Sequence, residues 1–215
     1  IFDYISTYIS SKLSDRCLTD SSETEKYIKK ISKNEIDVIP FVFKNKKSIV
    51  PIDKRKYDFI FVGRLIKEKR IDLLLNLAKK ISNELSGLKF VFIFSGKKKS
   101  IKILKNNQAK FTIIYNIKNE KVIDYLRNSK FYIHLADREG MSMSTIESIQ
   151  SGCIPVIRPV GEIKNYVNAK TSIIINDDSE NSIENAVKNI LKIIFNGKKL
   201  KEMQRLGLMN VSQLP

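Results

Sequence analysis

Short apolar runs alternate with amphipathic stretches over most of the chain. Uninterrupted apolar runs are typical of strands that are buried on both faces of a parallel sheet. Strands that alternate with helices predict a doubly wound, Rossmann-like α/β fold, with helices on both faces of a parallel sheet. The predicted strands are 57–62, 88–94, 111–115, 131–135, 154–157 and 172–175.

The segments between these runs carry apolar residues every three or four positions, which predicts helices with one buried face. The longest stripes follow the first strand and the Asp177–Ser179 turn. The first stripe consists of Ile71, Leu74, Leu75, Ala78, Ile81 and Leu85, and the second of Ile183, Val187, Ile190, Leu191 and Ile194. Shorter helices are predicted at 100–107, 118–127 and 198–208, behind Gly140 and behind Gly161.

Residues 1–56 have a different organisation. We predict an amphipathic helix over 1–14, a strand over 16–19, a helix from the Asp20–Ser21 cap to about residue 31, and a strand over 36–40. The polar, basic segment Lys44–Lys56 reads as a linker. The predicted division is therefore a first-domain remnant (1–43), a linker (44–56), a main domain (57–196) and a terminal helix or tail (197–215).

Composition supports a folded chain with anionic partners. An apolar content of 42% in 215 residues is enough for a core, and 39 Lys+Arg against 23 Asp+Glu give a net charge of +16. Nucleotide phosphates, nucleic acid or an acidic membrane face would suit that charge, although lysine is abundant everywhere and surface lysine can be functionally silent. Cys17 and Cys153 make no disulfide framework, which suits a reducing cytosol. No signal peptide or span of about 20 apolar residues is visible, and Ile1 suggests a clipped chain.

The stretch 137–156, DREGMSMSTIESIQSGCIPV, concentrates the candidate chemistry. It follows a predicted strand, so it should lie at the crevice where α/β sheets bind ligands. Glu139 would lie in the turn, and Glu147 about one turn into the next helix. The helix start should form an anion site, with free backbone N–H groups from Gly140, Ser142, Ser144 and Thr145. A competing interpretation needs no ligand, because Ser144 and Glu147 have the spacing of a capping box.

The start of the first long helix is electrostatically unfavourable. Lys67, Lys69 and Arg70 crowd its positive end, where each cation is disfavoured by some tenths of a kcal/mol. An anion bound between Arg64 and Lys69 would resolve that conflict, and broken local rules often mark functional sites. The alternative is a solvated basic turn in a lysine-rich chain.

The Glu139/Glu147 pair, with Gly140 behind the first and Ser151–Val156 behind the second, resembles the donor-site signature of retaining glycosyltransferases with the GT-B fold, of the family 4 type. The resemblance implies a nucleotide-sugar donor. Glu139 would hydrogen-bond the donor sugar and Glu147 would hold the ribose hydroxyls. The intervening backbone would meet the diphosphate, with Met141 beside Glu139 shaping the sugar site.

The segment Gly63–Lys69 is similar to a second motif of that family. There Arg64 and Lys69 would stabilise the departing diphosphate, which is the task of a basic clamp, and backbone groups near Ile117 would read the base. The chain departs from the family at several positions. Arg70, Lys98, Tyr115 and Glu162 stand where glycines are usual, and Asn165 stands where a glutamate is usual.

The resemblance implies the donor-binding half of an enzyme that transfers a hexosyl unit from a UDP- or GDP-sugar, with retention, to a glycan or lipid-linked acceptor. We expect no metal and no other cofactor, because two cations and a helix N-terminus would neutralise the phosphates. We expect a cytoplasmic location, possible peripheral contact with an anionic membrane face, a role in polysaccharide biosynthesis, and no nucleic-acid partner.

Two alternatives stay open. A nucleotide-sugar epimerase of the same fold would more often have a histidine-rich cleft, whereas this chain has one histidine, His134, which we expect to be structural. A nucleic-acid-binding module would interleave aromatic residues with Lys and Arg, whereas most aromatic residues here lie in apolar strands.

Overall fold

The computed structural model describes residues 2–19, 21–39, 48–96 and 111–214. Its main sheet has six strands in the order β5-β4-β3-β6-β7-β8, and every neighbouring pair is parallel. This is the doubly wound order, which confirms the predicted fold class. The strands are β3 (Tyr57–Arg64), β4 (Phe90–Ser95), β5 (Thr112–Tyr115), β6 (Ser129–His134), β7 (Ile154–Ile157) and β8 (Ile173–Ile174).

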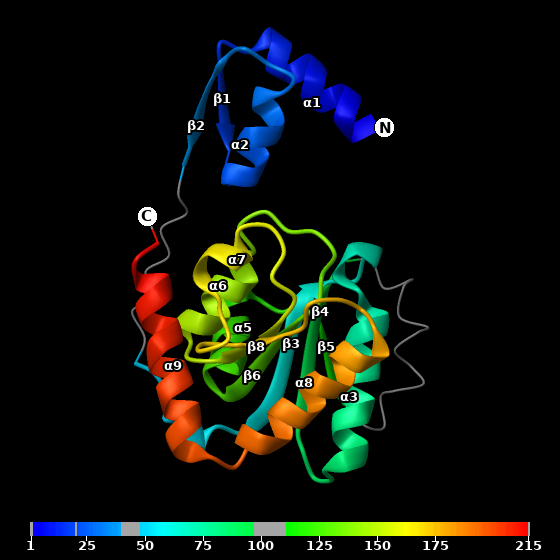
Figure 1. The fold of residues 1–215 in the computed structure, drawn as a ribbon, viewed down its shortest axis with the longest axis vertical. Helices are drawn as coiled ribbons and strands as arrows, with labels where there is room; N and C mark the ends of the chain where they lie inside the picture. Colours follow the sequence, from blue (N-terminus) through cyan, green and yellow to red (C-terminus); the bar gives the residue numbers. More distant parts are fainter. Residues whose placement is uncertain (1, 20, 40–47, 97–110, 215) are drawn as a thin grey trace.

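Helices cover both faces of this sheet (Figure 1). α3 (Ile71–Glu84) and α8 (Glu180–Ile193) share one apolar cluster with Phe59 and Phe61. α5 (Asn119–Arg127) packs on the opposite face with Ile60, and α6 (Met143–Gln150) lies beside α5. Successive strand residues point to opposite faces, so an uninterrupted apolar strand fills both layers.

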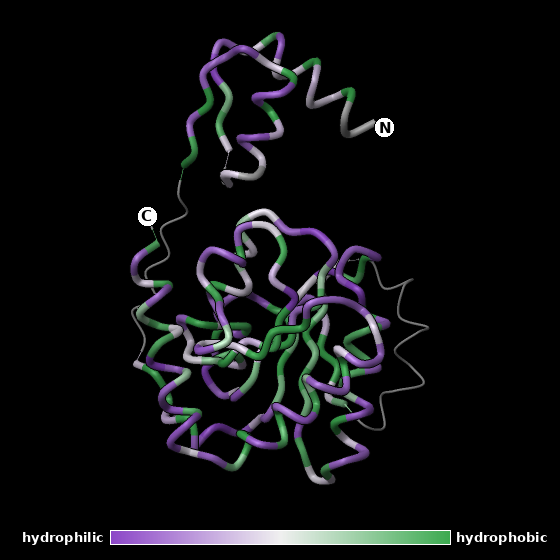
Figure 2. The backbone as a smooth tube through the Cα atoms, viewed as in Figure 1, coloured by the Kyte–Doolittle hydropathy of each residue, from purple (hydrophilic) through white to green (hydrophobic). Residues whose placement is uncertain are grey.

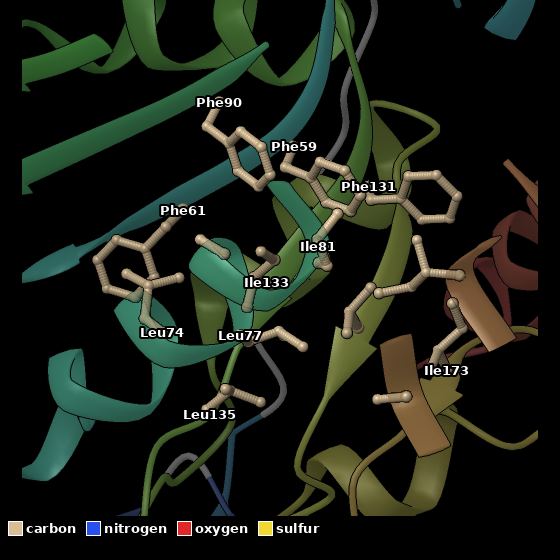
Figure 3. Packing of buried hydrophobic residues seen from close by; sticks show 14 of the residues in the cluster. Phe59, Phe61, Leu74, Leu77, Ile81, Phe90, Phe131, Ile133, Leu135 and Ile173 are labelled. Atoms are coloured by element: carbon tan, nitrogen blue, oxygen red, sulfur yellow. The ribbon is translucent and has the colours of Figure 1, made fainter. Parts of the chain in front are cut away.

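Stacked phenylalanine rings form the centre of the first layer. Phe59 lies between Phe90 and Phe131, with ring centroids 4.8 and 5.2 Å away, and Figure 3 shows the three rings in a row above Ile81. Each ring is at most 3% exposed, and burial of such a side chain contributes about 1.5–3 kcal/mol. The tube in Figure 2 is correspondingly most apolar along the central strands.

Residues before the linker form a small separate unit (Figure 1). Its parallel strands β1 (Arg16–Thr19) and β2 (Glu35–Val38) join α1 (Phe2–Leu13) and α2 (Ser22–Lys29). Ser21 is the N-cap of α2 and accepts a hydrogen bond from the Thr24 N–H, as predicted, whereas Asp20 lies outside the described residues. The apolar stripe predicted for α1 is not buried in this unit, because Ile9 is 50% exposed.

The described part of the predicted linker packs against the main domain. Ile52, in the short helix η1 (Ile52–Lys54), is 1% exposed. The buried Arg55 guanidinium donates to the carbonyls of Ser129 at 2.6 Å and Ser151 at 2.9 Å. Residues 48–56 of the predicted linker are therefore anchored to the main domain by the Ile52 side chain and the Arg55 guanidinium.

The last elements complete the main domain. α7 (Ile163–Tyr166) follows Gly161, and α9 (Gly197–Ser212) packs against α6 and β7. Ser179 caps α8 by accepting a hydrogen bond from the Ser182 N–H. The helix predicted over 100–107 and the Lys98 position lie outside the described residues. In the described part of the chain, no helix is both long and apolar enough to cross a bilayer.

Candidate functional site

A cleft of about 310 Å³ opens at the carboxyl ends of the central strands. Its volume falls in the range of about 300–1,000 Å³ that is usual for small-molecule sites. It lies over the carboxyl ends of β3 and β4, next to the point between β3 and β6 where the chain order of the strands reverses, which is the expected ligand position in this fold. Its walls are Val62, Gly63, Arg64, Lys69, Ile93, Phe94, Ser95, Asn116, Ile117, Asn119, Val122 and Ser144.

Glu139 lies behind this cleft with a cation on one side and an imidazole on the other. Lys69 Nζ pairs with Glu139 Oε1, and His134 Nε2 lies 2.8 Å from the same oxygen. The Glu139 side chain is only 12% exposed. Burial acts to raise the pKa of Glu139, but His134 and Lys69 outweigh it, so the pKa lies below its ordinary value. Glu139 is therefore an ionised and largely neutralised carboxylate.

The turn that carries Glu139 is fixed by its backbone. The Asp137 N–H donates to Glu68 O at 2.9 Å, which ties the turn to the 3-10 helix η2 (Lys67–Lys69). On the other side the Glu162 N–H donates to Gly140 O at 3.1 Å. Gly161 has a φ of +59°, and a Cβ there would lie 2.0 Å from Glu139 O, so the turn requires glycine.

Met141 contributes less to the cleft than the sequence suggested. Its side chain is 7% exposed and belongs to an apolar cluster with Ile146 and Val167. Its carbonyl accepts a hydrogen bond from the Tyr166 hydroxyl at 2.9 Å. The prediction that Met141 shapes a sugar site can therefore apply only to its backbone, because the side chain packs away in the core.

The start of α6 contradicts the capping-box interpretation. The N-cap is Ser142, in the left-handed conformation with φ 54°, and not Ser144. The Ser144 hydroxyl instead accepts a hydrogen bond from Tyr132 at 2.8 Å. The expectation of a free Thr145 N–H is also wrong, because that group donates to Ser142 O at 2.9 Å. Ser142 and Thr145 bond to each other through their hydroxyls at 2.8 Å, so both side chains stabilise the helix start.

Glu147 has no cation within salt-bridge distance among the described residues. The residue is 8% exposed, and its Oε1 accepts one long hydrogen bond, 3.4 Å, from the Asn119 amide. Burial raises the pKa of Glu147 above its ordinary value, and Asn119 only partly opposes that shift. Since Asn119 also lines the cleft, Glu147 lies directly behind the wall with unused acceptor capacity.

Arg64, Gly63 and Ile117 reach the same cleft, in agreement with their predicted proximity. Arg64 ends β3 and is exposed, whereas Lys69 is held by Glu139. An anion between the two cations would therefore meet one exposed guanidinium and one ammonium that is already oriented. Lys67 and Lys69 lie in η2 and not in α3, whereas Arg70 is the N-cap residue of α3 and makes no side-chain capping hydrogen bond.

Arg70 explains one departure from the family pattern. Its backbone adopts the left-handed conformation, with φ 46°, which favours glycine and costs another residue about 1–2 kcal/mol. Its guanidinium donates to Asp72 at 2.9 Å, Asp137 at 3.1 Å and Asp178 at 3.1 Å. These carboxylates, Asp72 foremost, raise the pKa of Arg70, with burial opposing them. The side chain thus links the first turn of α3 with the turns that carry Asp137 and Asp178.

Sequence reasoning missed the buried partners of the site residues. His134 was expected to be structural, yet its ring touches Glu139 and the Tyr132 hydroxyl. Alternation along β6 offered a signal, since Tyr132 and His134 share one face of the strand while Phe131 and Ile133 lie on the other. Asn119 gave no local signal, because it meets Glu147 across 28 positions of sequence.

Comparison with known families decides the class. The sequence matches the family described as glycosyl transferases group 1 over residues 42–207. The chain belongs to this family. The comparison with curated proteins gives no match. The match spans the cleft, both carboxylates and the Arg64–Lys69 segment.

Solved structures of other glycosyltransferases share the fold. The pneumococcal O-GlcNAc transferase GtfA, solved with UDP and GlcNAc, aligns with a TM-score of 0.76 and 20% identity over 99% of this chain and 44% of its own. TarM aligns with a TM-score of 0.77 and 18% identity over 100% of this chain and 43% of its own. Sucrose-phosphate synthase from Thermosynechococcus elongatus aligns with a TM-score of 0.73 and 15% identity over 96% of this chain and 56% of its own. The chain therefore spans about half the length of these proteins.

Proposed function

We propose that this group 1 glycosyltransferase chain binds a nucleotide sugar in the cleft at the carboxyl ends of β3 and β4, beside the start of α6. In this proposal the chain is the donor-binding part of an enzyme that transfers a hexosyl unit, with retention, to a glycan or lipid-linked acceptor. The observation that carries the proposal is the meeting of two cations, a helix start and two buried carboxylates at one cleft. Such a combination suits a ligand that joins a diphosphate to hydroxyl-rich groups.

The diphosphate would lie between Arg64, Lys69 and the first turn of α6. Backbone N–H groups of Gly63, Gly140 and the α6 start are suited to phosphate oxygens, since a helix leaves its first N–H groups without intrahelical partners. As the bond to the sugar breaks, negative charge grows on the leaving diphosphate. Preoriented cations stabilise that charge without reorganisation. Glu139 orients the Lys69 ammonium for this role.

The sugar and the ribose would use the two carboxylates. Glu139, ionised and fixed by the turn, would accept hydrogen bonds from sugar hydroxyls. Glu147 would accept from the ribose hydroxyls, which supply the donors that its surroundings lack. The base would lie near Ile117, where backbone groups face the cleft. The UDP in the GtfA complex favours uridine as the first nucleoside to test.

The proposal includes no metal, because Arg64, Lys69 and the helix start supply the positive charge that the diphosphate requires. It places the acceptor beyond this chain, since the solved relatives are about twice as long. A role in polysaccharide biosynthesis at the inner face of the cell membrane rests on the family and on the net charge of +16.

Calorimetric titration of the chain with UDP and with GDP tests the proposal. Saturable binding of one nucleotide is expected, unchanged by EDTA and weakened about tenfold or more by Lys69→Ala and by Glu147→Ala. Lys80→Ala is the matched control, because Lys80 pairs with Glu180 on the far side of α3 from the cleft residues. Nucleotide binding that neither Lys69→Ala nor Glu147→Ala weakens would contradict the proposed site. Efficient sugar transfer by this chain alone would contradict its assignment as the donor-binding part only.

A further inference from the structure

A buried row of polar side chains connects Glu139 with the first turn of α6. His134 Nε2 lies 2.8 Å from Glu139 Oε1, and His134 Nδ1 lies 3.2 Å from the Tyr132 hydroxyl. Tyr132 then donates to Ser144 Oγ at 2.8 Å. The row thus runs from the carboxylate that holds Lys69 to a hydroxyl on the cleft wall.

The two central members of the row are fully buried. Tyr132 and His134 are each 0% exposed, and their rings stack with centroids 5.9 Å apart. Burial of a phenol and an imidazole is costly unless their polar atoms find partners. Hydrophobic residues of similar size would have filled this face of β6 without that cost. The polar pair is therefore expected to serve the site that its two ends reach.

The protons in this row can be counted. Tyr132 has one hydroxyl proton, which it donates to Ser144, so its oxygen must accept from His134 Nδ1. His134 Nε2 makes no hydrogen bond of regular angle among the described residues, yet it lies 2.8 Å from a carboxylate oxygen. Two lone pairs facing each other at that distance would repel. A proton placed between His134 and Glu139 would turn this contact into a charge-assisted hydrogen bond.

We propose that His134 is a positioning residue of the donor site, which shares one proton with Glu139 once the donor is bound and, through Tyr132, directs the Ser144 hydroxyl proton into the cleft. This inference rests on the proposed function. The shared proton leaves the His134–Glu139 pair without net charge, so the positive charge of Lys69 stays uncompensated for an anion in the cleft. Because Ser144 Oγ accepts from Tyr132, its own proton is available to a phosphate oxygen.

Ligand binding should strengthen this arrangement. In the free protein, burial lowers the pKa of His134, Glu139 opposes that shift and Lys69 adds to it. Glu147 and Tyr166 lie near the row as well, and the charges of Glu139 and Glu147 both act to raise the pKa of Tyr132. A bound diphosphate adds negative charge and so raises the pKa of His134 in the complex. Binding should therefore take up a proton and weaken as pH rises through the His134 pKa.

The single histidine makes the test direct. In a chain labelled with ¹⁵N-histidine, the chemical shifts of the two ring nitrogens report the protonation of His134 without overlap from any other histidine. Addition of UDP at neutral pH should move both nitrogens to the doubly protonated position. Glu139→Gln should lower the His134 pKa even without nucleotide, because the variant removes the negative charge that favours the protonated imidazole.

Variants separate positioning from simple packing. His134→Leu should weaken UDP binding about tenfold, since it removes a hydrogen bond to a charged group. His134→Gln, whose amide can still donate toward Glu139, should recover much of that loss. Tyr132→Phe should weaken binding as much as Ser144→Ala does. Circular dichroism and thermal melts identify any variant that fails to fold, which is then left out of the comparison.

Two results would overturn the inference. One is saturable UDP binding by the wild-type chain with unchanged His134 ring shifts. The other is a His134 pKa in the free protein that Glu139→Gln leaves unaltered. A wild-type chain that binds neither UDP nor GDP would instead contradict the proposed function, and the free-protein titration would still decide whether Glu139 favours the protonated His134 imidazole.

Discussion

Glu139 and Glu147 lie on either side of the start of α6, yet their surroundings are opposite. Glu139 contacts Lys69 and His134, which together lower its pKa despite its burial. Among the described residues, Glu147 accepts a side-chain hydrogen bond only from the Asn119 amide, at 3.4 Å, and burial raises the pKa of Glu147. One carboxylate is neutralised by the protein itself. The other keeps most of the energetic penalty of its burial, which hydrogen bonds from the ribose hydroxyls would offset in the proposed complex.

Disruption of the Glu139 turn should have the largest effect on this contrast. Gly161→Ala places a Cβ 2.0 Å from Glu139 O at a φ of +59°. We expect a loss of about 3 kcal/mol or more in unfolding free energy, or displacement of the turn and about 100-fold weaker UDP binding. Urea unfolding and calorimetry measure the two effects.

Gly87→Ala is the matched control for that substitution. Gly87 has a φ of +82°, but no atom lies within 4 Å of a Cβ placed there. It should cost only the left-handed conformation, about 1–2 kcal/mol, and leave UDP binding intact. Equal losses in the two variants would show that the close approach at Gly161 has no special role.

Lys69→Met should make the environment of Glu139 more like that of Glu147, because it removes the cation that pairs with Glu139. Removing one partner of a buried ion pair usually costs about 3–5 kcal/mol. Since His134 remains beside Glu139, we expect about 2 kcal/mol here, together with a higher Glu139 pKa and weaker UDP binding. Unfolding free energies at neutral pH measure the loss. A stability equal to that of wild type would mean that the Lys69–Glu139 pair contributes nothing to folding.

The pH dependence of stability should separate the two carboxylates by sign. The lowered pKa of Glu139 stabilises the fold above the ordinary pKa of about 4.5, and that contribution is lost as pH falls through the folded value. The raised pKa of Glu147 gives the opposite dependence, present below about 4.5 and lost as pH rises through the folded value.

Glutamine substitutions measure each contribution in urea unfolding from about pH 3.5 to pH 7, on either side of the ordinary glutamate pKa. Glu139→Gln should flatten the acid-side loss of stability. Glu147→Gln should gain stability relative to wild type as pH rises, while it weakens UDP binding. If the difference in unfolding free energy from wild type changed with pH in the same direction for both variants, the two carboxylates would not differ as described.

Asn119→Ala should have the smallest effect. Its hydrogen bond to Glu147 is long, so we expect a loss of about 0.5 kcal/mol in unfolding free energy and a further rise in the Glu147 pKa. UDP binding should weaken only severalfold. Side-chain carboxyl NMR follows the pKa, and a fall in the Glu147 pKa would show that Asn119 does not stabilise the ionised form.

Most of the sheet could be predicted because apolar runs directly record burial on both faces. Strand boundaries shifted by only one or two residues, as with β4, which begins at Phe90 rather than residue 88. The small N-terminal unit was predicted in order as well. The exposed apolar stripe of α1 was not, because periodicity shows that a helix has an apolar face but does not show whether another element covers it.

The candidate site was predicted only in outline. Motif spacing brought Arg64, Lys69 and the α6 start to one cleft, but partner choice depends on contacts between distant segments. The capping-box interpretation failed because Tyr132 takes up the Ser144 hydroxyl and Ser142 adopts a left-handed backbone. The Lys69–Glu139 pair joins residues 70 positions apart. No local pattern contains that information.

Mapping of UDP on the chain by backbone amide NMR tests the central claim most directly. We predict saturable shifts concentrated at Gly63, Ile117, Gly140 and Ser144, around the cleft at the carboxyl ends of β3 and β4. A second cavity of about 670 Å³ beside Leu65, Ile71 and Asp72 provides an internal comparison, because the same experiment observes it. Shifts concentrated there, or saturable binding that leaves the α6 start unperturbed, would contradict the assignment of the donor site.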